Sequence, residues 1–292
     1  TGGQEAAPTQ DSTKYHTILT DEAWRHVLEE IRRAKRLAVD TETTSLNPRK
    51  AALVGLSLAW EPGRAVYVPV GHRYLGAPEQ LPLDRVLSDL RPFLEDTKIA
   101  KIGHNLKFDL QVLRRQGAWL RGLAADTMVA SYVLDPGRVS HSLSDVGAEF
   151  LGERKESIEG LIGKGAKQIS MAEVSVERAA PYAARDADLA FRLAPLLEAK
   201  LDEAGLTPLY RDVEMPLVEV LAGMEDAGVR VDTAHLVSLR EEFAGLLQST
   251  EKKMFEAARE EFNVNSPKQL SELLFQRLGL PPGRRTKTGF ST

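Results

Sequence analysis

Two acidic residues, Asp40 and Glu42, end the apolar stretch "RLAVDTET" at residues 36–43. The pattern predicts a β-strand, in which residues two apart share a face, so both carboxylates point the same way. A carboxylate at the end of a buried strand is costly unless it is paired or bound to a metal ion. The pair can therefore hold a divalent cation, but carboxylates in this pattern also cap turns or lie on edge strands.

A second polar pair, Asn105 and Asp109, lies in "IGHNLKFDLQVL" at residues 102–113. The pattern predicts a strand that ends at Gly103 and a following helix capped by Asn105, with leucines on its buried stripe. Asn105 and Asp109 are one helical turn apart, so they share a different, accessible face. Asp109 is either a further metal ligand or a solvated acid favoured by the helix dipole.

A third pair, Tyr182 and Asp186, lies in "PYAARDADLAFRL" at residues 181–193. On a helix the two residues are one turn apart on one face, whereas Asp188 falls on another side and is expected to be solvated. The commoner role of a tyrosine at such a position is core packing with its hydroxyl at the rim. The alternative is a hydroxyl that contacts a reacting group.

The elements that must position these residues alternate between two periodicities. Thr20 is expected to cap a first helix. Strands are expected at residues 36–43, 53–60, 64–70 and 98–103, and helices at 82–95, 106–116, 141–151 and 177–203. Strands in a meander, followed by strands alternating with helices, predict an α/β domain with a mixed sheet.

Three segments are expected along the chain. Residues 1–13 are small and polar and predict a tail or linker. Residues 14–206 form the α/β domain, and residues 207–292 are almost entirely helical in pattern. In the last segment Ser266 is expected to cap a helix that has Pro267 at its first position.

Composition limits the classes of protein to which the chain can belong. Its 292 residues are 42% hydrophobic and 27% charged, as in an ordinary globular protein of about two domains. The sequence contains no apolar run of about 18 residues and no signal-peptide pattern, so nothing in it points to a membrane or to export. The absence of cysteine excludes disulfides and thiolate metal sites and fits a reducing cytoplasm. A net charge of −4 argues against a general nucleic-acid coat but not against local binding.

Taken together, the three pairs form a recognisable set of motifs. A strand with D-x-E, a helix start with N-x-x-[FY]-D and a helix with Y-x-x-x-D occur in that order. This set resembles the DEDD superfamily of 3′-5′ exonucleases, in the subclass that carries tyrosine in its third motif.

A longer set of segments, running from about residue 15 to the end of the chain, resembles the bacterial DNA polymerase I family (family A). Its proofreading domain is matched by "DTETTSL", "LVGLSLAWEPG", "AVYVPVGH", "HNLKFDL", "DTMVASYVL", "LIGKGAKQ" and "YAARDADL". The start of its polymerase region, including the thumb, is matched by "VEMPLVEVLAGMEDAGVRVD" and "FNVNSPKQLSELLFQRLGL" with "RRTKTGFST".

The resemblance implies a ribonuclease H-like mixed β-sheet flanked by helices, followed by an all-α thumb-like segment. It implies two divalent cations, Mg²⁺ or Mn²⁺, with Zn²⁺ able to take one site. Asp40, Glu42 and Asp186 would hold one ion, and Asp40 with Asp109 the second. Two such ions can serve the attacking and departing oxygens of an in-line phosphoryl displacement. Tyr182 would orient the attacking water, because a phenol with a pKa of about 10 is a poor base at neutral pH.

On the substrate side, the resemblance implies release of nucleoside 5′-monophosphates from the single-stranded 3′ end of DNA. Leu46 would wedge against the terminal base, and Asn105 would contact the substrate backbone. Ile158 stands where other members place an aromatic residue, so it lacks the additional stacking of an aromatic ring. Phe108 stands where many relatives have tyrosine. The segment "GKGAK" lacks the spacing of a phosphate-binding P-loop.

Two other functions remain open at this point. A ribonuclease D-like 3′-5′ exoribonuclease shares the tyrosine-type motifs, but the region after residue 207 resembles a polymerase thumb instead of that nuclease's helical modules. A catalytically silent DNA-binding scaffold would have lost metal ligands, whereas all four carboxylates are present. Polymerase motifs such as D-Y-S-Q-x-E are absent from these residues. The palm and fingers are therefore expected elsewhere in the natural protein, and no nucleotide addition is expected from this chain alone.

Overall fold

The computed structural model describes residues 14–283, 285–286 and 289–290, so the predicted tail at residues 1–13 lies outside the described part. The chain divides into two compact units, Thr1–Gly228 and Val229–Thr292. Within the described residues, no helix combines the length and the apolar character needed to cross a membrane.

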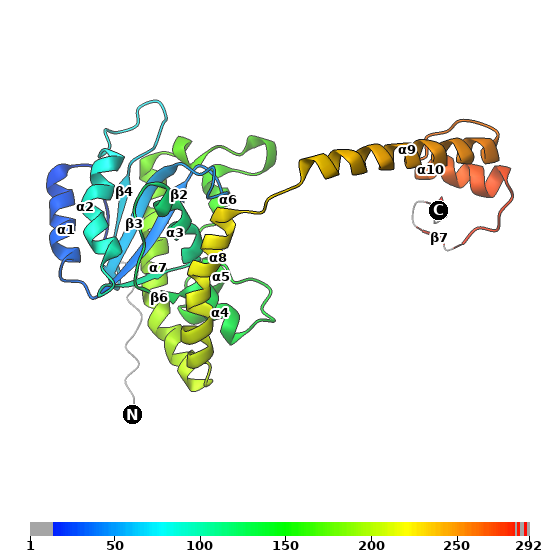
Figure 1. Ribbon diagram of the computed structural model, residues 1–292. Helices are drawn as coiled ribbons and strands as arrows, with labels where there is room; N and C mark the ends of the chain where they lie inside the picture. Colours follow the sequence, from blue (N-terminus) through cyan, green and yellow to red (C-terminus); the bar gives the residue numbers. More distant parts are fainter. Residues whose placement is uncertain (1–13, 284, 287–288, 291–292) are drawn as a thin grey trace. The chain divides into compact units, whose positions relative to one another are not determined.

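The first unit is built on a six-stranded mixed sheet (Figure 1). The strand order is β1-β4-β3-β2-β5-β6, in which β3 pairs antiparallel with β2 and β4, and the other neighbours are parallel. The strands are β1 (Lys14–Thr17), β2 (Arg36–Thr43), β3 (Leu53–Glu61), β4 (Arg64–Pro69), β5 (Ala100–Gly103) and β6 (Leu123–Asp126). This confirms the predicted α/β class and mixed sheet.

Helices cover both faces of this sheet. The α-helices are α1 (Asp21–Ile31), α2 (Leu83–Glu95), α3 (Leu106–Arg115), α4 (Thr127–Leu134), α5 (Leu143–Phe150), α6 (Ile158–Ile162), α7 (Val176–Glu203) and α8 (Met215–Ala227). Two 3₁₀ turns, η2 (Gly165–Lys167) and η3 (Met171–Glu173), and one π-helical segment, η4 (Leu209–Glu214), complete the helical elements described in this unit. Thr20 caps α1 as predicted, because its side chain accepts from the Ala23 N–H.

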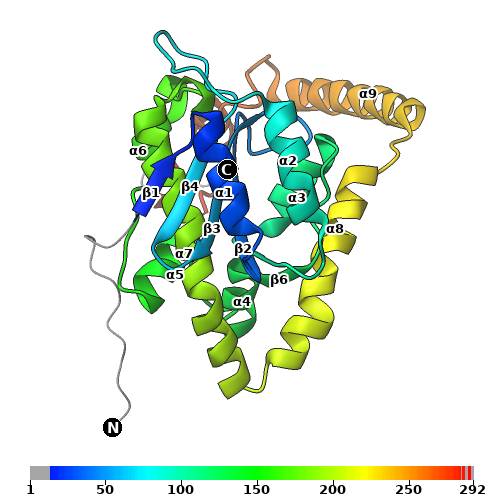
Figure 2. The same cartoon turned by 90° about the vertical axis from the view of Figure 1, so that its left-hand side faces the viewer.

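The two faces of β2 belong to different cores. Leu37 and Val39 pack in the cluster that contains residues of α1, α2 and α3, whereas Ala38 packs in the cluster formed with α7. Figures 1 and 2 show α1 and α2 on one side of the sheet and α7 on the other. The contact with α7 consists largely of alanines, which let a helix and a sheet approach closely. Asp40 and Glu42 continue the Ala38 face, so both carboxylates are directed toward α7.

The first unit continues beyond residue 206. Tyr210 in η4 is buried, and its hydroxyl accepts from the Asp126 N–H at 2.8 Å. Ala222 in α8 is buried in the core cluster shared with α1, α2 and α3. Residues 207–228 thus pack with the sheet, while the boundary at 206/207 stays a prediction about domain organisation.

The second unit is mostly helical. Its elements are α9 (Thr233–Ala258), α10 (Pro267–Ser271), η5 (Glu272–Arg277), β7 (Arg285–Thr286) and β8 (Gly289–Phe290). The Ser266 side chain accepts from the Gln269 N–H at 3.4 Å, with Pro267 at the first helical position, as predicted. The last two strands pair antiparallel, which the sequence pattern does not predict.

Candidate active site

Three of the predicted metal ligands form one cluster between β2 and α7. Asp40 and Glu42 lie on β2 and Asp186 lies on α7, and each residue offers one carboxylate oxygen within 4.8 Å of those of the other two. Glu42 and Asp186 are buried. The two-residue spacing on the strand and the alanine-rich contact with α7 are what bring these side chains together.

The cluster has unsatisfied oxygens. Among the described residues, Asp40 Oδ2 and Asp186 Oδ1 are buried and have no hydrogen-bond partner. Burial, followed by the charge of Asp186, raises the pKa of Asp40 to about 7. Burial, with the charges of Asp40 and Asp186 added, also raises the pKa of Glu42 well above its usual value. Hard oxygen ligands with free lone pairs and mutual repulsion fit a divalent cation such as Mg²⁺ or Mn²⁺.

Asp109 approaches the site from the other face of the sheet. It lies on α3, and its Oδ1 accepts from the Thr41 N–H at 2.9 Å and from the Thr41 hydroxyl at 2.6 Å. Asp109 is buried, so the accessible helix face expected for it is wrong: α3 packs this face against β2. Burial and the charge of Asp40 raise the pKa of Asp109 well above its usual value. Its part in a second ion site stays a prediction.

Asn105 stands at the start of α3, but its side chain makes no capping hydrogen bond. The Asp126 carboxylate accepts instead from the Asn105 N–H at 3.0 Å and the Leu106 N–H at 2.7 Å. The same carboxylate caps α4 through Met128 and Val129. The predicted cap is therefore wrong, because a residue from β6 satisfies these amides and leaves the Asn105 side chain free of that role.

Tyr182 lies on α7 one turn before Asp186, as predicted. Burial and the charge of Asp186 hold the pKa of the Tyr182 hydroxyl above its usual range, so the group stays protonated at neutral pH. The Lys155 ammonium lies over the Tyr182 ring, 3.8 Å from its centroid, and forms an ion pair with Asp186 Oδ2. No spacing in the sequence indicates that Lys155 reaches this site.

The two apolar residues expected to contact substrate line one cavity. Leu46, with 89% of its surface exposed, and Ile158 both face a hollow of about 430 Å³ beyond the end of β2. Gly165 of the "GKGAK" segment lines the same cavity. Phe108 is partly buried and packs against the core cluster that contains residues of α3.

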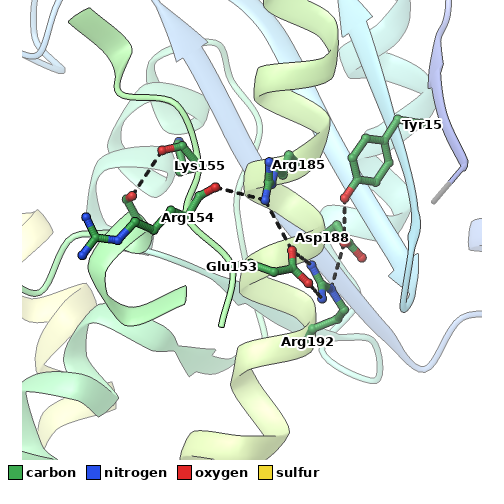
Figure 3. Close-up of polar contacts among 8 residues, drawn as sticks. Tyr15, Glu153, Arg154, Lys155, Arg185, Asp188 and Arg192 are labelled. Atoms are coloured by element: carbon green, nitrogen blue, oxygen red, sulfur yellow. Dashed lines mark hydrogen bonds and ion pairs between the residues drawn. The ribbon is translucent and has the colours of Figure 1, made fainter. Parts of the chain in front are cut away.

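Asp188 is not solvated, contrary to the expectation from its helix face. It is fully buried and accepts from the Tyr15 hydroxyl at 2.8 Å, the Gly63 N–H at 2.6 Å and Arg192 Nε at 2.9 Å. Arg192 also holds both oxygens of Glu153, at 2.7 and 2.9 Å (Figure 3). The helix face of Asp188 is covered by β1, a strand that the sequence pattern does not predict.

Comparison with known proteins identifies the family. Residues 15–202 match the family model of the 3′-5′ exonuclease domain. The chain belongs to this 3′-5′ exonuclease family. Residues 233–292 match the model of DNA polymerase family A, so the exonuclease domain is followed by polymerase sequence, as the motifs predict.

The relatives agree with this assignment. The chain is 40% identical to DNA polymerase I of Pseudomonas aeruginosa over 98% of its own length and 32% of the relative's. It is also 40% identical to DNA polymerase I of Chloroflexus aurantiacus, over 96% of the chain and 29% of the relative. The chain thus spans about a third of the length of these relatives.

Solved structures show the same fold. The structure described as the POL domain of Pol1 from M. smegmatis, in complex with DNA primer-template and dNTP, matches with a TM-score of 0.70 and 25% identity. The match covers 95% of this chain and 43% of that one. Brucella melitensis NrnC matches with a TM-score of 0.55 and 22% identity over 75% of this chain and 95% of its own, which shows a shared fold.

Proposed function

We propose that this chain removes nucleotides from the single-stranded 3′ end of DNA, as the proofreading part of a family A DNA polymerase. The observation that carries the proposal is the cluster of Asp40, Glu42 and Asp186, in which Asp40 Oδ2 and Asp186 Oδ1 are buried without a hydrogen-bond partner among the described residues. A buried group of like charges is unfavourable by itself, so its presence in a 3′-5′ exonuclease domain supports cation binding for catalysis.

Each carboxylate has a proposed place in the site. Asp40, Glu42 and Asp186 would hold one divalent cation, and Asp40 with Asp109 the second. Mg²⁺ or Mn²⁺ suits these oxygen ligands, and Zn²⁺ could take one site. Bound cations would activate the attacking water and stabilise charge on the departing 3′ oxygen. The two hydrogen bonds from Thr41 fix the orientation of Asp109.

The remaining residues would position the substrate and the water. The Tyr182 hydroxyl keeps its proton at neutral pH, which supports orientation of the attacking water over proton abstraction. Leu46 and Ile158 would hold the terminal base in the cavity that they share, and Asn105 would contact the substrate backbone. Because Ile158 is aliphatic, we expect a weaker hold on the base than an aromatic ring would give.

An exoribonuclease of the ribonuclease D type remains the alternative. The match to the family A polymerase model after residue 233 favours DNA, and the metal-ligand cluster argues against a silent scaffold. The partners would be the 3′ terminus of a DNA primer and the palm and fingers of the polymerase. Such a substrate would place the activity in the bacterial cytoplasm, in association with the nucleoid.

Digestion of 3′-labelled single-stranded DNA and RNA with Mg²⁺ tests the proposal. We expect DNA to be shortened from its 3′ end. Asp40→Ala and Asp186→Ala should each reduce the rate by more than about 100-fold, because even the loss of a residue that only hydrogen-bonds a metal ligand costs up to about this factor. Asp84→Ala, which removes an exposed carboxylate from α2, serves as the control. Full activity of Asp40→Ala would contradict the metal assignment, and a strong preference for RNA would favour the exoribonuclease.

A further inference from the structure

Lys155 is a buried cation inside the carboxylate cluster. Its side chain is 8% exposed, and its ammonium group pairs with Asp186 Oδ2 while lying over the ring of Tyr182. A lysine normally keeps its ammonium group in water, so burial of this one against two proposed active-site residues calls for a compensating role.

The segment that carries Lys155 is held firmly in place. Glu153 receives both Nη atoms of Arg192, and Arg185 donates to the Arg154 carbonyl at 3.2 Å (Figure 3). Arg192 is itself fixed by the buried carboxylate of Asp188. This network, whose arginines and aspartate lie on α7, sets the backbone of residues 153–155 beside the helix that carries Tyr182 and Asp186. These contacts position the backbone of Lys155 so that its side chain reaches Asp186.

We propose that Lys155 is the resident cation of this cluster in the metal-free chain, and that a divalent cation binds by displacing its ammonium group from Asp186. This inference rests on the proposed function, since it requires that the cluster binds such ions. The lysine offsets the repulsion among the three clustered carboxylates before metal arrives. Because it competes for the same oxygen ligands, it also lowers the affinity of the site for metal.

Manganese binding to the full chain, measured by calorimetry, tests the exchange. Lys155→Met should bind Mn²⁺ about tenfold more tightly, because removing a competing buried charge is worth at least this factor. Its metal-free unfolding temperature should fall, and saturating Mn²⁺ should remove the difference. Lys155→Arg, which keeps the charge, should bind Mn²⁺ as the unsubstituted chain does. Unchanged or weaker Mn²⁺ binding by Lys155→Met would overturn the inference.

Lys164→Met is the matched control for this substitution. Lys164 also pairs with a carboxylate, Glu159, but its side chain is 74% exposed. The same loss of charge at this position should leave the Mn²⁺ dissociation constant unchanged. If Lys164→Met bound Mn²⁺ as much more tightly as Lys155→Met does, the loss of any positive charge would raise the affinity for Mn²⁺. That result would overturn the specific role of Lys155.

Amine labelling of the unsubstituted chain gives a readout that no folding defect can affect. An acetylating reagent followed by peptide mass spectrometry should modify Lys155 slowly without metal and several-fold faster with Mn²⁺, whereas Lys164 should not change. Labelling of Lys155 that stays constant or slows would overturn the exchange. If Asp186→Asn loses Mn²⁺ binding, but Lys155→Met does not bind Mn²⁺ more tightly and labelling of Lys155 does not become faster with Mn²⁺, the proposed function stands without the exchange. If the unsubstituted chain binds no Mn²⁺, the proposed function fails as well.

Discussion

At the residue scale, Asp40 shows how burial couples the site to the stability of the chain. Its pKa is raised to about 7 in the folded state, from an ordinary value of 3.8. Between these pH values the folded, metal-free chain binds a proton that the unfolded chain has released. The free energy of unfolding therefore falls as pH rises through this window. Ionised Asp40 therefore opposes folding of the metal-free chain above about pH 7, and a bound divalent cation would remove this cost.

We predict that Asp40→Asn stabilises the metal-free chain at pH 8 and has little effect near pH 4. The substitution removes the charge that burial penalises at high pH, whereas Asp40 itself is largely protonated at low pH. Urea unfolding in a chelator across this range measures the difference, with the exposed Asp84→Asn as control. Parallel stability curves for Asp40→Asn and the unsubstituted chain would show that Asp40 does not titrate in this way.

At the scale of elements, a glycine in β3 lets an aromatic ring cover the strand beside the cluster. Gly55 is the register partner of Glu42, and a Cβ built there would lie 2.2 Å from the Tyr67 hydroxyl. That hydroxyl is 2.7 Å from His72 Nε2, and His72 Nδ1 is 2.8 Å from the Val174 carbonyl. Since only a ring N–H can donate to the carbonyl, Tyr67 donates to Nε2. The chain of bonds ties the sheet to the segment before α7.

We predict that Gly55→Ala destabilises the chain by about 1–3 kcal/mol, because the methyl group forces Tyr67 from its position. Gly223→Ala is the matched control: it lies within α8, with nothing within 4 Å of its added Cβ. This change should stabilise by about 0.5–1 kcal/mol through helix propensity. Thermal unfolding measures both, and equal effects of the two substitutions would contradict the role of Gly55.

At the scale of the whole molecule, the compact unit and the family match end at different places. The exonuclease match ends at residue 202, but the first compact unit ends at Gly228. Between them, Tyr210 bonds to the backbone of Asp126, the residue that caps α3 and α4. Ion pairs from Lys107 to Glu225 and from Arg114 to Asp226 join α3 to α8. The helices after residue 206 therefore support the helix that carries Asp109.

We predict that a chain ending at Gly228 unfolds cooperatively, whereas a chain ending at Leu206 is less stable by several kcal/mol, because truncation exposes the core contacts of Tyr210, Met215 and Ala222. Urea denaturation followed by circular dichroism compares the two. Equal stability would place the structural boundary at 206/207.

Much of the site could be predicted from the sequence because its periodicities are local. Strand β2 and helix α7 have the expected extents, and the strand and helix spacings correctly place Asp40 with Glu42 and Tyr182 near Asp186. Strands β1 and β6 escape prediction because each has only four residues at an edge of the sheet, too few to show alternation. Helix α4 begins directly after β6, so no loop residues separate the two patterns.

The sequence by itself determined which carboxylates this protein has, on which elements they lie and to which exonuclease family it belongs. Only the tertiary structure decided their partners: Thr41 against Asp109, Tyr15 against Asp188, and Lys155 against Asp186. The physical reason is the range of the interactions. Spacing along one element fixes a shared face, whereas a contact between two elements, or between a loop and a helix, depends on how closely their backbones pack.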